Sequence, residues 1–290
     1  MPKKLSVCIV IVVVLSLACA APEQPVGELA IDPQSIEMSY PQFVRVALTW
    51  TMTEPLEELS GTPRVFLHLV DAGGDVVRTF DHDLPRSWSV GGETTYDVVL
   101  SESALVPALP DGQYALTAGI YDGAGHRWPL TVTGEEVRPL EYRIATVTAS
   151  SSGVTPQFFF SAAWLPVEGG TDLQILARRW LAEDGVLRLS EIPGEGTLYL
   201  RIGIPRGSGS QELVMTDESS VPAVRLSTTC GDYETAVSGS GSHVAEVPVA
   251  GGIEEDACDV SFSSNFHLLS RDNMSRRTLA LEDLSWSAGR

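Results

Sequence analysis

Apolar and polar residues alternate with a period of two along much of the chain. In residues 43–52, FVRVALTWTM, the apolar side chains of Val44, Val46, Leu48 and Trp50 alternate with a second, more polar set. Successive side chains of a β-strand point to opposite faces of the sheet. The pattern therefore predicts a half-buried strand whose apolar face covers a core.

The first half of the chain contains a series of such runs, separated by turn residues. Residues 64–81, RVFLHLVDAGGDVVRTFD, predict a hairpin because two β-rich runs flank the turn at 71–75, where glycine adopts positive φ without strain. Residues 109–130 predict another hairpin, and residues 94–103 a further strand. About seven short strands of this kind indicate an immunoglobulin-like β-sandwich over residues 34–148.

The same period returns after a linker of small residues at 149–155. In the run GTLYLRIGIP, for example, Leu198, Leu200 and Ile202 occupy alternate positions. These runs predict a second β-sandwich, of jelly-roll type, over residues 156–287. The expected fold class is therefore all-β, with two β-sandwich domains.

One segment departs from the period of two. Residues 171–184, TDLQILARRWLAED, place Leu173, Leu176, Trp180 and Leu181 at spacings of three and four. This spacing is typical of an amphipathic helix, so we expect a short helix or an irregular connection here.

The N-terminus has the three parts of a bacterial export signal. The basic start MPKK precedes an apolar run, residues 5–18, that is too short to remain as a membrane-spanning helix. The sequence LSLAC resembles a lipobox, which implies that residues 1–18 are removed and that Cys19 receives a diacylglycerol. Ordinary cleavage at the small-x-small site around Cys19 is the alternative. Residues 19–33 are polar and rich in proline, and we expect them to form a tether.

The acidic composition argues against one class of partner. The formal net charge is −19, and the two lysines, Lys3 and Lys4, lie within the predicted leader. An acidic surface repels nucleic acid and anionic lipid headgroups. We therefore do not expect the protein to bind nucleic acid.

Two cysteines remain beyond the leader and the predicted lipidation site. In an oxidising compartment, Cys230 and Cys258 are expected to form a disulfide. A metal site needs more ligands than these two cysteines offer, and the chain contains no C-x-x-C spacing.

The order of the predicted strands also carries a resemblance. The runs VFLHLVD, DVVRTFDHDLP and LPDGQYALTAGIYD resemble an accessory β-sandwich module of bacterial envelope proteins, including some attached to membrane glycosyltransferases. This resemblance covers residues 31–147 and implies a sandwich without catalytic residues. Residues 156–286 resemble a jelly roll of the galactose-binding-like or carbohydrate-binding-module type.

The sequence contains no recognisable motif for covalent or metal catalysis. It has no G-x-S-x-G, and its five histidines are scattered without H-E-x-x-H or H-x-H. Residues 81–83, Asp-His-Asp, combine a histidine with two carboxylates, but on a strand His82 points away from both. The acidic segments 71–75 and 254–259 permit a structural calcium, although solvated loops are the simpler interpretation. We expect no catalytic residue, no metal and no cofactor.

Exposed aromatic rings are the remaining candidates for ligand binding. Trp50, Trp164 and Trp286 fall in apolar strand patterns, and we expect them in the cores. The other tryptophans lie near turns or beside arginines, where a ring is able to stack on a sugar. The possible ligand platforms are Trp88, Trp128 and Trp180.

The function that agrees best with these features is non-catalytic. We expect an exported lipoprotein, anchored by its lipid to a membrane of the bacterial cell envelope, that binds or scaffolds a polysaccharide or another envelope protein. One alternative is a polysaccharide-active enzyme or its accessory subunit. Another is a purely structural component of the envelope.

Overall fold

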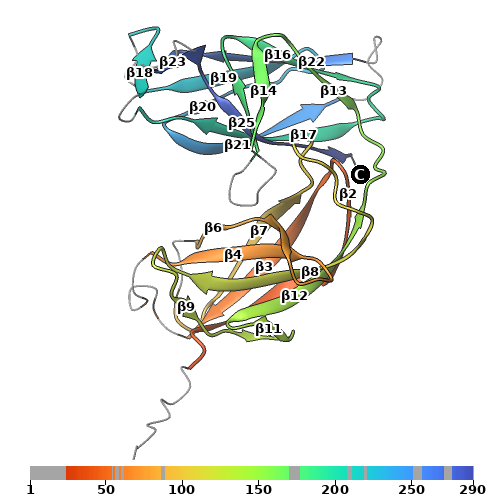
Figure 1. The fold of residues 1–290 in the computed structure, drawn as a ribbon, viewed down its shortest axis with the longest axis vertical. Helices are drawn as coiled ribbons and strands as arrows, with labels where there is room; N and C mark the ends of the chain where they lie inside the picture. Colours follow the sequence, from red (N-terminus) through yellow and green to blue (C-terminus); the bar gives the residue numbers. More distant parts are fainter. Residues whose placement is uncertain are drawn as a thin grey trace, which may run out of the picture.

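Figure 1 shows the computed structural model of the chain. The structure describes residues 24–53, 55, 59, 62–85, 89–169, 177–207, 211–218, 221–250, 257–270 and 276–289. Every helix or strand assigned in these ranges is a β-strand, which confirms the all-β class. The predicted leader, Cys19 and Trp88 lie outside the described residues. No helix in the described ranges is long and apolar enough to cross a membrane.

The first sandwich is built from two sheets. The smaller sheet contains, in spatial order, β10 (Thr131–Val132), β1 (Gly27–Asp32), β3 (Phe43–Met52) and β7 (Glu93–Ser101). The larger sheet contains, in order, β11 (Glu136–Arg138), β12 (Glu141–Ser150), β8 (Gly112–Tyr121), β4 (Arg64–Val70) and β5 (Val76–Thr79). Three further strands pair with β12, β4 and β8, and they are β2 (Ser35–Ser39), β6 (His82–Asp83) and β9 (Arg127–Trp128).

The core of this sandwich lies between the two sheets. Leu48 and Trp50 of β3 are fully buried in one cluster with Leu67 of β4 and Leu116 of β8. The outward residue Arg45 of β3 is exposed, so the alternation predicted for residues 43–52 is confirmed.

The hairpin predicted around residues 71–75 is also confirmed. The Asp71 N–H donates to the Asp75 carbonyl at 2.9 Å, and β4 pairs antiparallel with β5. Gly74 adopts a φ of +89°, a conformation that glycine reaches without a Cβ clash.

The second sandwich encloses a core of its own. One sheet contains, in order, β13 (Gln157–Phe160), β16 (Gly185–Ser190), β22 (Ala257–Ser264), β19 (Ala223–Thr228) and β20 (Glu234–Ser238). The facing sheet contains, in order, β14 (Trp164–Glu168), β15 (Arg178–Leu181), β25 (Ala280–Ala288), β17 (Gly196–Ile204) and β21 (Gly241–Val249). A small third sheet consists of β18 (Gln211–Met215), β23 (Phe266–Ser270) and β24 (Arg276–Arg277).

Two other predictions about this sandwich are confirmed. Cys258 on β22 forms a disulfide with Cys230, which follows the neighbouring strand β19. Trp164 and Trp286 are buried in the core of this sandwich.

The structure corrects two expectations about local structure. The tether predicted over residues 19–33 is too long, because Gly27–Asp32 forms β1 and buries Leu29 and Ile31 against the first core. We expected a short helix or an irregular connection over residues 171–184. This is wrong for Arg178–Leu181, which forms strand β15, and residues 171–176 lie outside the described residues. A strand of four residues shows too few alternations to be recognised from sequence.

Candidate functional site

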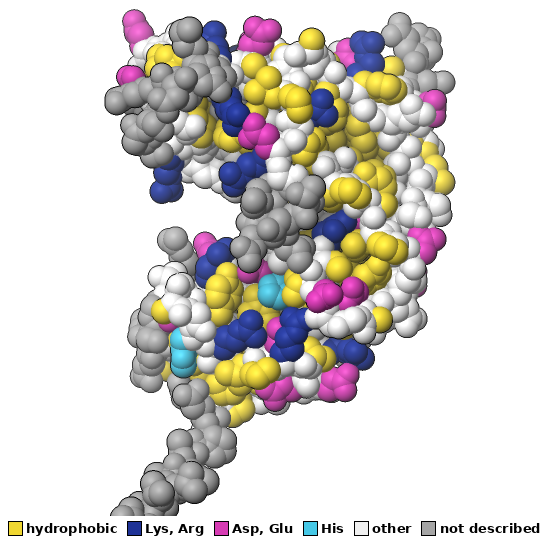
Figure 2. Space-filling model, viewed as in Figure 1, with side chains coloured by type: hydrophobic (Ala, Val, Ile, Leu, Met, Phe, Trp, Pro, Cys, Tyr) yellow, Lys and Arg dark blue, Asp and Glu magenta, His cyan; other side chains and the backbone are white. Residues whose placement is uncertain are grey.

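Strands of both sandwiches border a cleft of about 1160 Å³. Figure 2 shows the hollow between the two bodies. The first sandwich contributes residues of β3, β7 and the segment around β6, and the second contributes residues of β15, β17, β21 and β25. Ligand sites form preferentially at such interfaces between domains. This cleft is therefore the candidate functional site.

Strand alternation explains which side chains border the cleft. On β17, Leu198, Leu200 and Ile202 are fully buried in the second core, so Tyr199 and Arg201 point to the opposite face and line the cleft. The residues that form the cores thus determine which residues are presented to a ligand.

Several charged side chains of the cleft form ion pairs. Arg45 of β3 contacts Glu246 of β21 at 2.5 Å, an ion pair that joins the two sandwiches. On the second sandwich, Arg178 lies 3.3 Å from Glu282. The carboxylate of Glu282 also accepts a hydrogen bond from the Ser242 hydroxyl at 2.8 Å. These contacts within the protein hold the polar groups in position along the cleft.

The closed end of the cleft is a buried joint between the sandwiches. The rings of Phe43 and Tyr199 lie 5.3 Å apart, and both side chains are buried. Beside them the Ser101 hydroxyl donates a hydrogen bond to the buried carboxyl of Asp283. Burial raises the pKa of Asp283, although Ser101 and Arg201 act in the opposite direction. The joint thus holds polar groups that are removed from water.

The segment that follows β7 of the first sandwich, residues 103–105, contacts the second sandwich directly. The Ala104 N–H donates to the carbonyl of Leu284 on β25 at 2.7 Å, and the Leu284 N–H donates to the Ser103 hydroxyl at 3.2 Å. The next residue, Leu105, is buried in the core of the second sandwich. The joint is therefore partly a shared hydrophobic core, which resists separation more than a surface contact does.

Of the three predicted platforms, Trp180 lies in the cleft. Its half-buried ring lines the wall formed by the second sandwich. The Trp180 ring N–H donates to Glu168 at 3.1 Å, and the guanidinium of Arg277 lies 5.1 Å from the ring centre. The position of Trp88 is outside the described residues.

The structure does not support Trp128 as a platform. Its side chain is 7% exposed and belongs to the first core, with the His126 ring edge-on at 4.6 Å. A ring buried to this extent cannot stack on a sugar. The polar neighbours in sequence suggested exposure, but the pairing of β9 with β8 turns the ring inward.

The side chains of the Asp-His-Asp segment, residues 81–83, contact different partners and do not converge on one point. The two ring nitrogens of His82 lie 2.9 Å from the Phe80 carbonyl and 2.8 Å from the Tyr96 hydroxyl. Asp83 accepts a hydrogen bond from Arg64 at 3.0 Å. Within the described residues, no group of three His, Cys, Asp or Glu side chains is arranged to hold a metal ion.

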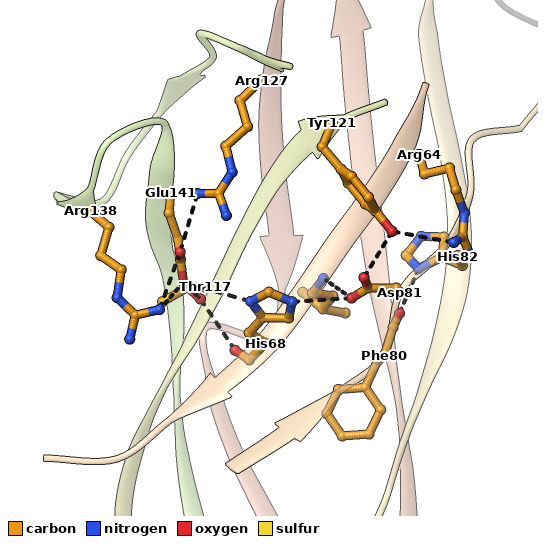
Figure 3. Close-up of polar contacts among 11 residues, drawn as sticks. Arg64, His68, Phe80, Asp81, His82, Thr117, Tyr121, Arg127, Arg138 and Glu141 are labelled. Carbon is orange, nitrogen blue, oxygen red and sulfur yellow. Dashed lines mark hydrogen bonds and ion pairs between the residues drawn. The ribbon is translucent and has the colours of Figure 1, made fainter. Parts of the chain in front are cut away.

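Sequence reasoning missed a polar network on the outer face of the larger sheet, next to the cleft (Figure 3). His68 of β4 lies 3.3 Å from Asp81 and 3.8 Å from Glu141 of β12. Asp81 also lines the cleft and accepts a hydrogen bond from the Tyr121 hydroxyl at 3.0 Å. The network thus extends from the cleft across the outer face of the sheet to β12.

Glu141 is the most deeply buried charged side chain of this network. The Thr117 hydroxyl donates to it at 2.7 Å, and Arg138 and Arg127 lie 3.4 and 3.5 Å away. Burial opposes ionisation, but the contact with His68, the hydrogen bond from Thr117 and the charge of Arg138 lower the pKa of Glu141 to about 2. Burial alone would lower the pKa of His68, but Asp81 and Glu141 raise it. Its partners therefore keep Glu141 ionised at neutral pH.

Comparison with known proteins adds little to this description. No protein-family model and no curated protein matches the chain. Among solved structures, the adhesin InvE of Yersinia pseudotuberculosis is 9% identical, with a TM-score of 0.23, over 90% of this chain and 57% of that one. The matched region thus spans little more than half of the adhesin structure. A similarity of this strength supports no statement about function, and the resemblances inferred from the sequence stay predictions.

Proposed function

We propose that the protein is an exported, lipid-anchored binding protein that holds its ligand, without chemical conversion, in the cleft between its two sandwiches. The observation that carries this proposal is the cleft itself. Its volume of about 1160 Å³ and its lining of paired charges and aromatic rings suit an extended ligand.

The joint supports the same proposal. A site between two domains keeps its shape only where the domains are held together. Here the Phe43–Tyr199 contact, the Arg45–Glu246 pair and the inserted Leu105 hold the two walls. A preorganised site loses less entropy on binding than one that must close around its ligand.

Filling the cleft is expected to abolish binding. Val244 of β21 lines the cleft and is 50% exposed, so Val244→Arg adds bulk there without disturbing a core. The full-length protein, in a detergent without a sugar headgroup, is tested by affinity electrophoresis against xylan, glucomannan, soluble starch, dextran, pectate and alginate. We expect retention by at least one polymer, no new reducing ends in that polymer, and loss of retention in the variant.

The matched control is Val137→Arg. Val137 lies on β11, is 37% exposed and does not line the cleft, so this variant is expected to bind like the parent protein. Retention by none of the polymers, or undiminished retention of Val244→Arg, contradicts the proposed site. New reducing ends would favour the polysaccharide-active enzyme instead.

The lipid anchor is tested at Cys19. After expression in a bacterium, we expect the parent protein in the detergent phase of a phase-partitioning experiment and Cys19→Ser in the aqueous phase. Each buried methylene of an acyl chain contributes about 0.8 kcal/mol of membrane affinity, so loss of the chains shifts the partition strongly. Recovery of both proteins in the aqueous phase would show that Cys19 carries no anchor.

A further inference from the structure

We infer that the ligand of the cleft is an uncharged, hydroxyl-rich glycan chain and that Trp180 is the platform on which one of its sugar rings stacks. This inference rests on the proposed binding function and adds to it the class of ligand and the principal contact. It is supported independently by the geometry around Trp180 and by the charge balance of the cleft.

The ring of Trp180 is held in place by two neighbours that are themselves paired. Glu168 accepts the hydrogen bond from the ring N–H, and both of its carboxylate oxygens accept hydrogen bonds from Arg277, at 2.7 and 3.0 Å. The same guanidinium lies against the ring. Such a two-point pair restricts both side chains more than a single contact does. Trp180 therefore borders the cleft as a rigid apolar surface with its one polar atom already satisfied.

A rigid ring of this kind suits the face of a sugar. The axial C–H groups of a pyranose form a flat apolar patch, which packs on an aromatic face while the hydroxyl groups project from the rim. An aromatic platform that is already ordered loses little conformational entropy when it is covered. This support could not be recognised from local sequence patterns, because Glu168 and Arg277 lie 109 positions apart.

The charge balance of the cleft indicates an uncharged chain. The described lining contains five arginines and five carboxylates. The arginines are Arg45, Arg64, Arg178, Arg201 and Arg206, and the carboxylates are Asp81, Asp83, Asp97, Glu246 and Glu282. A polyanion needs uncompensated cations, and this lining has no excess of them. The protein as a whole carries a formal charge of −19, which repels a polyanion further.

Paired charges also match the chemistry of hydroxyl groups. Each hydroxyl is both a donor and an acceptor of hydrogen bonds. Pairs such as Arg45–Glu246, Arg64–Asp83 and Arg178–Glu282 place donors beside acceptors. Neighbouring hydroxyls of a sugar ring are able to donate to the carboxylate and accept from the guanidinium of the same pair. The cleft thus provides stacking and hydrogen bonds for the same ligand.

The test uses titration calorimetry on the full-length protein in the same detergent. The probes are neutral hexasaccharides of cellulose, xylan, mannan, starch and chitin, and the acidic hexamer of galacturonic acid. We expect binding of at least one neutral hexasaccharide and a weaker or absent signal with the acidic one. Trp180→Ala is expected to weaken that binding about tenfold or more, and Trp180→Tyr by less, because the tyrosine keeps an aromatic face.

Phe159→Ala is the matched control. Phe159 lies on β13, is 51% exposed and does not line the cleft, so its removal is expected to leave the affinity unchanged. Glu168→Gln keeps an acceptor for the ring but weakens the contact with Arg277, and we expect an intermediate loss. Circular dichroism and thermal unfolding show whether each variant is folded.

The outcomes separate this inference from the function on which it rests. Binding of the acidic hexamer alone, blocked by Val244→Arg, would overturn the uncharged ligand and leave the proposed function standing. Undiminished binding by folded Trp180→Ala would overturn the platform. Binding of no saccharide, together with no retention by any polymer, would overturn both.

Discussion

Replacing Glu141 with glutamine is expected to lower the free energy of unfolding by about 3 kcal/mol at pH 7. The pKa of Glu141 is about 2 in the folded protein, compared with an ordinary value of 4.5. The ionised form is therefore favoured by the fold, and its favourable contacts with His68, Arg127 and Arg138 are lost with the charge. Glutamine preserves the size of the side chain and an acceptor for Thr117.

The difference in the free energy of unfolding between the parent protein and Glu141→Gln should depend on pH. Because the pKa of Glu141 is lower in the folded state, its contribution is complete above about pH 5 and is lost as the pH falls from 4.5 towards 2. Urea unfolding at pH 7, 4 and 2.5 is the appropriate measurement. Glu93→Gln on the exposed side of β7 is the control, and we expect it to change stability by less than about 0.5 kcal/mol. An equal loss for Glu141→Gln at every pH would show that its charge is not the cause.

Replacing Leu105 with alanine is expected to destabilise the second sandwich by about 3 kcal/mol, although Leu105 follows a strand of the first. The side chain is buried in the second core, so its truncation removes buried apolar contacts and leaves a cavity there. Hydrogen exchange followed by mass spectrometry reports the protection of each sandwich separately. We expect faster exchange in β17 and β25.

Leu109→Ala provides the matched comparison. Leu109 lies four positions further along the same segment, but it is buried in the first core. Its truncation is expected to accelerate exchange in the first sandwich and to leave β17 and β25 protected. If both variants affected only the first sandwich, Leu105 would not be part of a shared core.

The strands could be predicted where apolar residues occupy every second position of a run. Leu198, Leu200 and Ile202 show this alternation directly, and the structure confirms their burial. The disulfide was predictable for a different reason, since Cys230 and Cys258 are the two cysteines that remain outside the predicted leader and the predicted lipidation site, Cys19. Both inferences depend on local pattern or on elimination and need no knowledge of tertiary contacts.

The candidate site could not be predicted in the same way. Glu141 contacts His68, which is 73 positions distant, and the burial of both depends on how β4 and β12 are placed around β8. Arg45 and Glu246 are separated by a still longer stretch of chain. Trp180, selected for its arginine neighbours, lines the cleft, whereas Trp128, selected by a similar argument, is buried. Composition around an aromatic residue does not determine which face of a strand it occupies.

The inserted segment around Leu105 has a kinetic consequence. Two bodies joined by one linker swing about it, and their opening and closing adds a slow step to the capture of a ligand. Here the two sandwiches are joined at two places. One is the linker from β12 to β13, and the other is Leu105, which follows a strand of the first sandwich but is buried in the core of the second. A swinging motion about the linker then requires Leu105 to leave that core. If the cleft binds a ligand as proposed, capture should accordingly proceed in a single phase, at a rate proportional to the concentration of ligand.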